Sequence, residues 1–413
     1  MGKNIVICSD GTGQTDDGDN PSNVARLCSL LDLKDRTQQI CGYDPGVGTV
    51  PGTEVSALTL PVDRCGKRTR SVWLPRWVKA TAGLTVGYGL KKNVEEMYSY
   101  LAENFADGDR IYLFGFSRGA FTVRVVAGLL SRCGLLLPGN LKCFQKAFEL
   151  YEPHYEIYKS EPSKLDELKR EVAAFKAKYA RPEQCQVHFL GIWDTVKSYG
   201  YFWPKSLPHT RHNQSIRIVR HALSIDEYRS FFAPTTWGWR DLDQEEGCLP
   251  QEEQQAPKDV KEVWFAGDHS DVGGGHNDSA IGLAKISLKW MVNEAASCCL
   301  RVDEGKYREM FKDLGSDQCK RHDEAKKLIW RASEHVPRRN LKNCPLPPTR
   351  EWTWRSTGPR RIGESRRNGG VLIHQSAQTL YDDEERKRLW GGLNIAWIAT
   401  TEHVGRESGV KCD

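Results

Sequence analysis

The sequence lacks several features that would place the chain in a common functional class. No hydrophobic run reaches the ~18 residues that a membrane-spanning helix requires, and neither a Walker A sequence nor an H-E-x-x-H motif is present. The net charge is only +5, with 59 basic and 54 acidic side chains, so the total charge indicates no polyanionic partner. We therefore expect neither an integral membrane protein nor a P-loop nucleotide-binding protein, and no nucleic-acid partner.

The 13 cysteines follow no metal-binding or redox spacing. There is no C-x-x-C pair, and Cys298 and Cys299 form the one adjacent pair. An odd number of scattered cysteines favours reduced, largely buried thiols in an intracellular protein. The N-terminus enters a strand-like run at Asn4 without a signal-peptide hydrophobic region, and Val6 stands where a myristoylation motif needs Ser or Thr. The expected location is cytoplasmic, with at most peripheral membrane contact.

Short apolar runs alternate with helical patterns along most of the chain. Strands are predicted at 4–8, 39–43, 110–116, 186–193, 260–266 and 371–376, and helices at 23–31, 91–105, 118–132, 216–226 and 281–291. This alternation predicts an α/β fold of the α/β-hydrolase type, in which helices flank a mainly parallel sheet. The interpretation places one catalytic domain at 1–300 and a C-terminal extension at 301–413 packed on the same domain.

Residues 140–180 interrupt the alternation with apolar side chains at helical spacing among many lysines and glutamates. Hydrolases of this fold often carry helical caps over their sites. The segment is therefore a helical insertion and a candidate lid, with an ordinary outer helical layer as the alternative.

The stretch 110–120 has the pattern of a nucleophile elbow. A β-forming run leads into Gly115-Phe116-Ser117-Arg118-Gly119, and a helical pattern follows directly. In such a motif the serine occupies a strained position at the tip of a sharp turn, and the two glycines let strand and helix approach closely. Ser117 is therefore the candidate nucleophile.

Functional side chains of parallel sheets gather where strands end. Reading those ends in chain order gives Asp10, Asp44, Ser117, Asp194 and His269. The last three follow the order serine, acid, histidine of an α/β-hydrolase triad. His269 would take the proton of Ser117, and Asp194 would orient the imidazole.

Several other residues compete for these roles. His276 and His221 are the rival bases, although the predicted helix around His221 favours a structural role. The rival acids are Asp226, Asp268 and Asp271.

The remaining site predictions concern the turns beside Ser117. The backbone N–H of Arg118 and one from the Gly11–Thr12 turn are the expected oxyanion-hole donors. Asp10 and Phe116 are the predicted substrate-binding residues, although Asp10 could instead shape the turn or cap the next helix.

Two further patterns concern ligands. Asp10, Asp44, Asp268, His269 and Asp271 could in principle converge on a metal, but no metal-ligand spacing supports this, so no metal and no cofactor are expected. The arginine-rich segment 355–367 could contact phosphates, with a solvated surface segment as the favoured alternative.

Seven short blocks together resemble one protein family. They are Cys8–Thr12, Tyr43–Thr49, Gly115–Ala120, Gly191–Val196, Arg220–Leu223, Asp226–Glu227 and His269–Gly275. The chain resembles, over about residues 3–300, the uncharacterised α/β-hydrolase domain family that includes the catalytic domain of type VI secretion phospholipase effectors. The resemblance implies ester hydrolysis, a variable C-terminal region, and Ser117 as the family nucleophile.

The sequence thus predicts a serine hydrolase that cleaves a carboxylic ester through an acyl-enzyme. A lipid or phospholipid acyl ester is the favoured substrate class. The alternatives are a non-catalytic binding protein on the same fold, or a phosphate- or nucleic-acid-binding protein that uses the glycine loops and arginine-rich segment.

Overall fold

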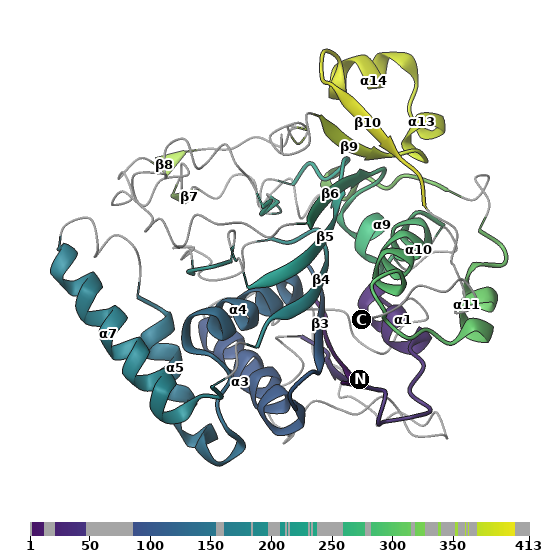
Figure 1. Cartoon of the computed structure of the whole chain (residues 1–413). Helices are drawn as coiled ribbons and strands as arrows, with labels where there is room; N and C mark the ends of the chain where they lie inside the picture. The colour runs from purple at the N-terminus through teal and green to yellow at the C-terminus, as the bar shows by residue number, and fades with distance from the viewer. Residues whose placement is uncertain are drawn as a thin grey trace, which may run out of the picture.

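The fold was obtained as a computed structural model (Figure 1). It describes residues 2–11, 21–46, 86–153, 161–182, 185–196, 207–210, 213, 215–229, 232, 234–237, 259–276, 282–314, 319–326, 338–339, 352–353, 360, 362 and 370–400. Thr12, the loop 47–50 and most of the arginine-rich segment 355–367 lie outside the described residues.

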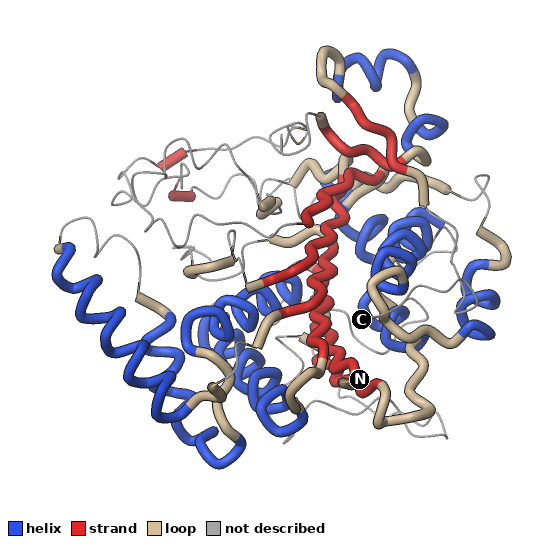
Figure 2. The backbone as a smooth tube through the Cα atoms, viewed as in Figure 1, coloured by secondary structure: helices blue, strands red, loops and turns tan. Residues whose placement is uncertain are grey.

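An eight-stranded parallel sheet forms the centre of the molecule (Figure 2), in the spatial order β10-β9-β6-β5-β4-β3-β1-β2. The strands are β1 Asn4–Ser9, β2 Gln39–Asp44, β3 Arg110–Phe116, β4 Val187–Trp193, β5 Ile216–Ser224, β6 Asp259–Phe265, β9 Val371–His374 and β10 Ile395–Ile398. The all-parallel sheet with flanking helices confirms the predicted α/β fold. Since the strands run in one direction, their carboxyl ends meet along one edge.

Helices cover both faces of this sheet (Figure 1). One face carries α3 Val86–Asn104, α4 Arg118–Cys133, α5 Phe144–Tyr151 and α7 Pro162–Tyr179, and the other carries α1 Asn23–Leu30, α9 His269–Gly273, α10 Gly282–Ala296 and α11 Glu304–Phe311. Alternate side chains of one strand enter different cores. Ile111 and Leu113 of β3 join the α3–α4 core, whereas Tyr112 and Phe114 join the α1–α10 core.

The predicted helix at 216–226 is wrong, because Ile216–Ser224 form β5, a strand inside the sheet. Arg220 and His221 interrupt its apolar pattern, yet both are buried through pairing. Arg220 forms ion pairs with Glu294 and Asp259, and His221 Nδ1 lies 2.9 Å from Glu262 Oε1. These pairs let polar residues occupy a strand that lies inside the sheet.

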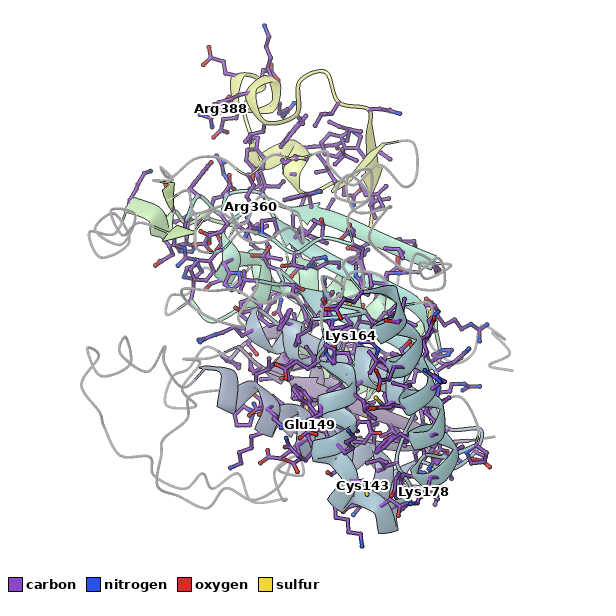
Figure 3. The ribbon with its side chains drawn as sticks, turned by 90° about the vertical axis from the view of Figure 1, so that its left-hand side faces the viewer. Cys143, Glu149, Lys164, Lys178, Arg360 and Arg388 are labelled. Carbon is purple, nitrogen blue, oxygen red and sulfur yellow. The ribbon has the colours of Figure 1, made fainter. Side chains whose placement is uncertain are left out.

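The described part of the helical insertion joins the outer layer of the fold. A 3-10 helix at Pro138–Cys143 leads into α5, whose Phe144, Ala147 and Phe148 are buried in the α3–α4 core. In Figure 3, Cys143 and Lys178 lie at the end of this layer that is farther from Arg360. Lys164, near the start of α7, lies nearer to Arg360 in the same view. A role as a lid stays a prediction.

The C-terminal region extends the sheet rather than forming a separate layer. β9 pairs in parallel with β6, and β10 pairs with β9. The short helices α13 Ala377–Leu380 and α14 Asp383–Trp390 pack with these strands around Trp264 and Trp390. Two further strands, β7 Arg338–Arg339 and β8 Trp352–Thr353, form a small antiparallel pair.

Two findings bear on the predicted environment of the protein. None of the described helices is both long and apolar enough to cross a bilayer. Among the described cysteines, Cys299 is disulfide-bonded and the others are free thiols. The expectation of reduced thiols is therefore wrong at Cys299, because pairing depends on spatial proximity that sequence spacing does not show.

Candidate active site

Ser117 stands at the tip of a sharp turn between β3 and α4. Its φ of 55° and ψ of −119° are sterically unfavourable for a residue with a side chain. The two flanking glycines make the turn feasible. A Cβ at Gly119 would lie 2.2 Å from the Ser9 carbonyl oxygen, and one at Gly115 would lie 2.7 Å from the Ala120 backbone. The strand, turn and helix therefore match the elbow geometry that the motif predicts.

The turn also aims the backbone of α4 at this position. Ser117 is the N-cap residue, but its hydroxyl caps none of the described N–H groups that begin the helix. Arg118 is the first residue of α4, so its N–H has no carbonyl partner within the helix. A free N–H and the positive end of a helix are suited to stabilising a developing oxyanion.

Asp194 and His269 meet at the ends of two other strands. Asp194 follows β4, His269 begins α9 after β6, and His269 Nδ1 lies 2.5 Å from Asp194 Oδ2. Two aromatic rings pack on the imidazole, because the ring centroids of Phe116 and Phe232 lie 4.6 Å and 4.8 Å from its centroid. The bond to Nδ1 leaves Nε2 as the nitrogen available for proton transfer.

Two contacts bring Ser117 and this pair to the same corner of the sheet. The Ser117 N–H donates to the Trp193 carbonyl, 3.0 Å away, so the serine turn lies against the residue that precedes Asp194. Phe116, the residue before Ser117, carries the ring that packs on His269. The three predicted side chains thus occupy one neighbourhood.

Asp194 is fixed by a network that the sequence did not indicate. Its backbone is strained, with φ of 35°, and its N–H donates to the Ala222 carbonyl at 2.7 Å. The next N–H, of Thr195, donates to His221 Nε2 at 3.3 Å, and the Ser224 N–H donates to Asp194 Oδ1 at 3.1 Å. Neighbouring β5 therefore sets the orientation of the carboxylate.

Arg360 is a buried partner of Asp194 that the sequence analysis did not predict. Its Nη1 lies 2.5 Å from Asp194 Oδ1 and its Nη2 3.0 Å from Oδ2, and it also bonds Ser224 and the Phe232 carbonyl. Burial opposes charge on Asp194, but Arg360 and His269 hold the pKa of its carboxyl well below the usual value. The preference for a solvated surface segment is therefore wrong at Arg360, and no motif around this arginine marks its partner.

The predicted oxyanion turn at Gly11 has a different bonding pattern. A Cβ at Gly11 would lie 3.2 Å from the Ser117 Cβ, so the turn does lie beside the serine. Its N–H, however, donates to Asp10 Oδ1 at 2.7 Å. Arg118 is thus the better placed of these two candidate donors, and Thr12 lies outside the described residues.

The two predicted substrate-binding residues contact protein groups. Asp10 Oδ2 accepts hydrogen bonds from Ser22 at 2.5 Å and from Tyr43 at 2.8 Å, and burial raises the pKa of Asp10 to about 6. These bonds join the ends of β1 and β2 to the N-terminus of α1, which agrees with the alternative that Asp10 shapes the turn. The Phe116 ring lies against His269. Contact of either residue with a substrate stays a prediction.

The rival acids and bases have other partners. Asp226 accepts from the Gly267 N–H and the Tyr381 hydroxyl, each through Oδ2. His276 Nε2 lies 2.9 Å from Asp268 Oδ1, and Asp271 Oδ1 lies 2.6 Å from the Nδ1 of His322. Asp44, at the end of β2, bonds Ser9 and Asn93. Among the described rivals, none of these contacts places another carboxylate on His269.

A parallel sheet of this topology, with a serine at the β3–α4 turn, defines an α/β-hydrolase-like protein. Residues 3–294 match the family described as the catalytic domain of Tle1-like phospholipase effectors of the type VI secretion system (T6SS). The chain belongs to this family.

The chain is also similar to a yeast protein and to a solved bacterial structure. The chain is 35% identical over 231 residues to an uncharacterized protein of Saccharomyces cerevisiae, covering 56% of this chain and 32% of the yeast protein. The match thus spans about a third of that relative. A crystal structure of an uncharacterized protein from Pseudomonas aeruginosa aligns with 76% of this chain and 49% of its own, at 18% identity and a TM-score of 0.41, which is too low to carry an argument.

Proposed function

We propose that the protein is a serine hydrolase that cleaves carboxylic esters of lipids, with phospholipid acyl esters as the substrate class. Family membership supports a lipid ester hydrolase in general. The observation that carries the finer proposal is the contact of His269 with Asp194 at the corner where the strained Ser117 turn lies.

The proposed reaction has two stages. His269 Nε2 accepts the proton of the Ser117 hydroxyl as its oxygen attacks the ester carbonyl, and then returns that proton to the departing alcohol. Water then attacks the carbonyl of the acyl-serine while His269 takes its proton, the bond between the acyl group and the Ser117 oxygen breaks, and His269 returns the proton to that oxygen as the carboxylic acid leaves. Asp194 keeps the imidazole in the productive tautomer and stabilises its protonated form, and the Arg118 N–H stabilises the oxyanion.

The nucleophile can be tested with the purified full chain. A fluorophosphonate probe is expected to label Ser117, and short p-nitrophenyl esters and phosphatidylcholine vesicles are expected to release p-nitrophenol and fatty acid. Ser117→Ala should abolish both labelling and hydrolysis, whereas Ser29→Ala, which alters an exposed serine on α1, should leave both unchanged. Retained labelling and hydrolysis in folded Ser117→Ala would refute the proposal.

The same assay separates this proposal from a binding role. A folded wild-type chain in which Ser117 does not react, and which binds vesicles without releasing fatty acid, would favour a non-catalytic binding protein. Hydrolysis of p-nitrophenyl esters without release of fatty acid from vesicles would support the esterase activity and contradict the lipid substrate.

A further inference from the structure

Five acidic and imidazole side chains lie together at α9 and the segment 319–326. They are Asp268 and Asp271 at the start of α9, His276 just after it, and His322 and Glu324 from the segment 319–326. We call them the acid–imidazole cluster. The candidate ligand atoms of Asp271, His276 and His322 lie within 4.8 Å of one another, as do those of Asp268, His276 and Glu324.

Backbone bonds fix the acids in this arrangement. Asp271 Oδ2 accepts from the N–H groups of Asp268 at 3.0 Å and His322 at 2.8 Å. Its Oδ1 lies 2.6 Å from His322 Nδ1 and 3.6 Å from His276 Nε2. Gly267, with φ of 99°, makes room, because a Cβ there would lie 2.3 Å from the Asp271 Cβ. The cluster is therefore organised by the fold.

The two oxygens of the Asp268 carboxylate differ in their contacts with the described residues. Its Oδ1 accepts from the N–H groups of Ser270 and Asp271 and contacts His276 Nε2, each at 2.9 Å. Its Oδ2 is buried and receives no hydrogen bond from the described residues, in a side chain that is 1% exposed. A buried carboxylate oxygen without a partner is costly. A bound cation would remove that cost.

The charges of the cluster also favour a cation. Asp268, Asp271 and Glu324 are three carboxylates, and Arg229, whose charge acts on Asp268 and Glu324, also bonds both oxygens of Glu227. The rings of His276 and His322 lie 4.0 Å apart with an angle of 31° between them. Each imidazole has a nitrogen beside a carboxylate oxygen of the cluster, so both rings can offer a ligand atom to one ion.

We propose that the acid–imidazole cluster binds one divalent first-row transition metal of the zinc class. His276, His322 and Asp271 supply three ligands, and a carboxylate of Asp268 or Glu324 supplies the fourth. Two imidazole nitrogens with carboxylate oxygens match the ligand preference of zinc over calcium or magnesium. The ion would tie the segment 319–326 to α9, the helix that begins with His269, and so hold the position of that helix.

A second group of candidate ligands must be separated in the test. The sulfur atoms of Cys8, Cys28 and Cys41 also lie within 4.8 Å of one another, in the α1–α10 core. Thiolates bind zinc tightly, so metal content alone does not identify the site.

The experiment measures zinc retained by the full-length protein after loading with Zn²⁺ and gel filtration. The wild type is expected to retain about one equivalent, as is normal for a single structural site. The variant His276→Gln/His322→Gln should lose that equivalent, while His188→Gln should keep it. His188 is a matched control, because its Nε2 contacts the Cys298 carbonyl at 3.1 Å and a glutamine amide can make the same bond.

X-ray absorption of the zinc-loaded wild type tests the ligands without any variant. Nitrogen and oxygen scatterers at ~2.0–2.1 Å support the cluster, and sulfur at ~2.3 Å overturns it. The proposal is also overturned if the double histidine variant retains its zinc while Cys28→Ser loses it. It is overturned as well if the wild type retains no zinc, because protons alone would then hold the cluster together. Ser117→Ala should keep its zinc, so failure of the proposed hydrolase and failure of the metal site are distinguishable.

Discussion

Arg360 and Asp194 form a buried two-point ion pair, although they are far apart in the chain and belong to different elements. The guanidinium fork matches the two carboxylate oxygens, and Oδ2 also faces His269. The C-terminal region thus supplies a charged group that holds the candidate triad acid in place.

Replacement of Arg360 tests this contact. Arg360→Met leaves Asp194 buried without its cation, and we expect a loss of about 3–5 kcal/mol in the free energy of unfolding. Arg360→Lys keeps the charge but loses the fork, so its loss should be smaller. Chemical denaturation measures both effects. Equal stability of wild type and Arg360→Met would show that the pair contributes nothing.

The strained backbone at Ser117 predicts that glycine is more stable than alanine at this position. Glycine adopts the observed φ of 55° without a Cβ clash, whereas alanine keeps the clash. Ser117→Gly should therefore be about 1 kcal/mol more stable than Ser117→Ala, although neither should hydrolyse esters. Thermal unfolding of the two variants compares them directly, and greater stability of the alanine variant would contradict the strained turn.

The close approach at Gly119 predicts a large effect of one methyl group. Gly119→Ala would place a Cβ 2.2 Å from the Ser9 carbonyl oxygen, so we expect a loss of roughly 3 kcal/mol or more. The control is Gly139→Ala in the 3-10 helix, where a Cβ meets no described atom within 4 Å. A change below about 0.5 kcal/mol is expected there. Similar unfolding midpoints for the two variants would refute the tight contact.

The raised pKa of the Asp10 carboxyl predicts that the free energy of unfolding depends on pH. Because burial raises its pKa to about 6 from 3.8, folding favours the protonated acid. Its contribution to stability is present in full below the unfolded pKa and is lost as pH rises through the folded pKa. From pH 4 to pH 7, the stability of the wild type relative to Asp10→Asn should fall by roughly 2 kcal/mol. Urea titrations at both values measure this, and a constant difference would contradict the prediction.

The sequence predicted the position of a candidate site residue where that residue comes directly after an apolar strand. The predicted elbow at Ser117, the strand before it and the helix after it appear as expected, because β-forming runs, glycines and helix starts are local signals. Asp194 and His269 could be proposed together because parallel strands bring their carboxyl ends to one edge. Their catalytic roles stay predictions.

The sequence was misleading where long-range pairing changes the environment of a polar residue. The segment that contains Arg220 and His221 was predicted to be a helix, and their partners on β6 and α10 explain how both residues are buried in β5. Arg360 looked like surface charge for the same reason. The acid–imidazole cluster was hidden because His276 and His322 come from separate segments. Pair formation across the fold has no signature in local composition.

The pairing of β9 with β6 has a practical consequence for shortened versions of the protein. A fragment cut near residue 294, where the family match ends, would lose both the strand that covers β6 and the arginine that neutralises Asp194. The exposed β6 would present unpaired N–H and C=O groups to other copies of the fragment. Such a piece is expected to self-associate through that open edge, so the family boundary is a poor place to divide the polypeptide.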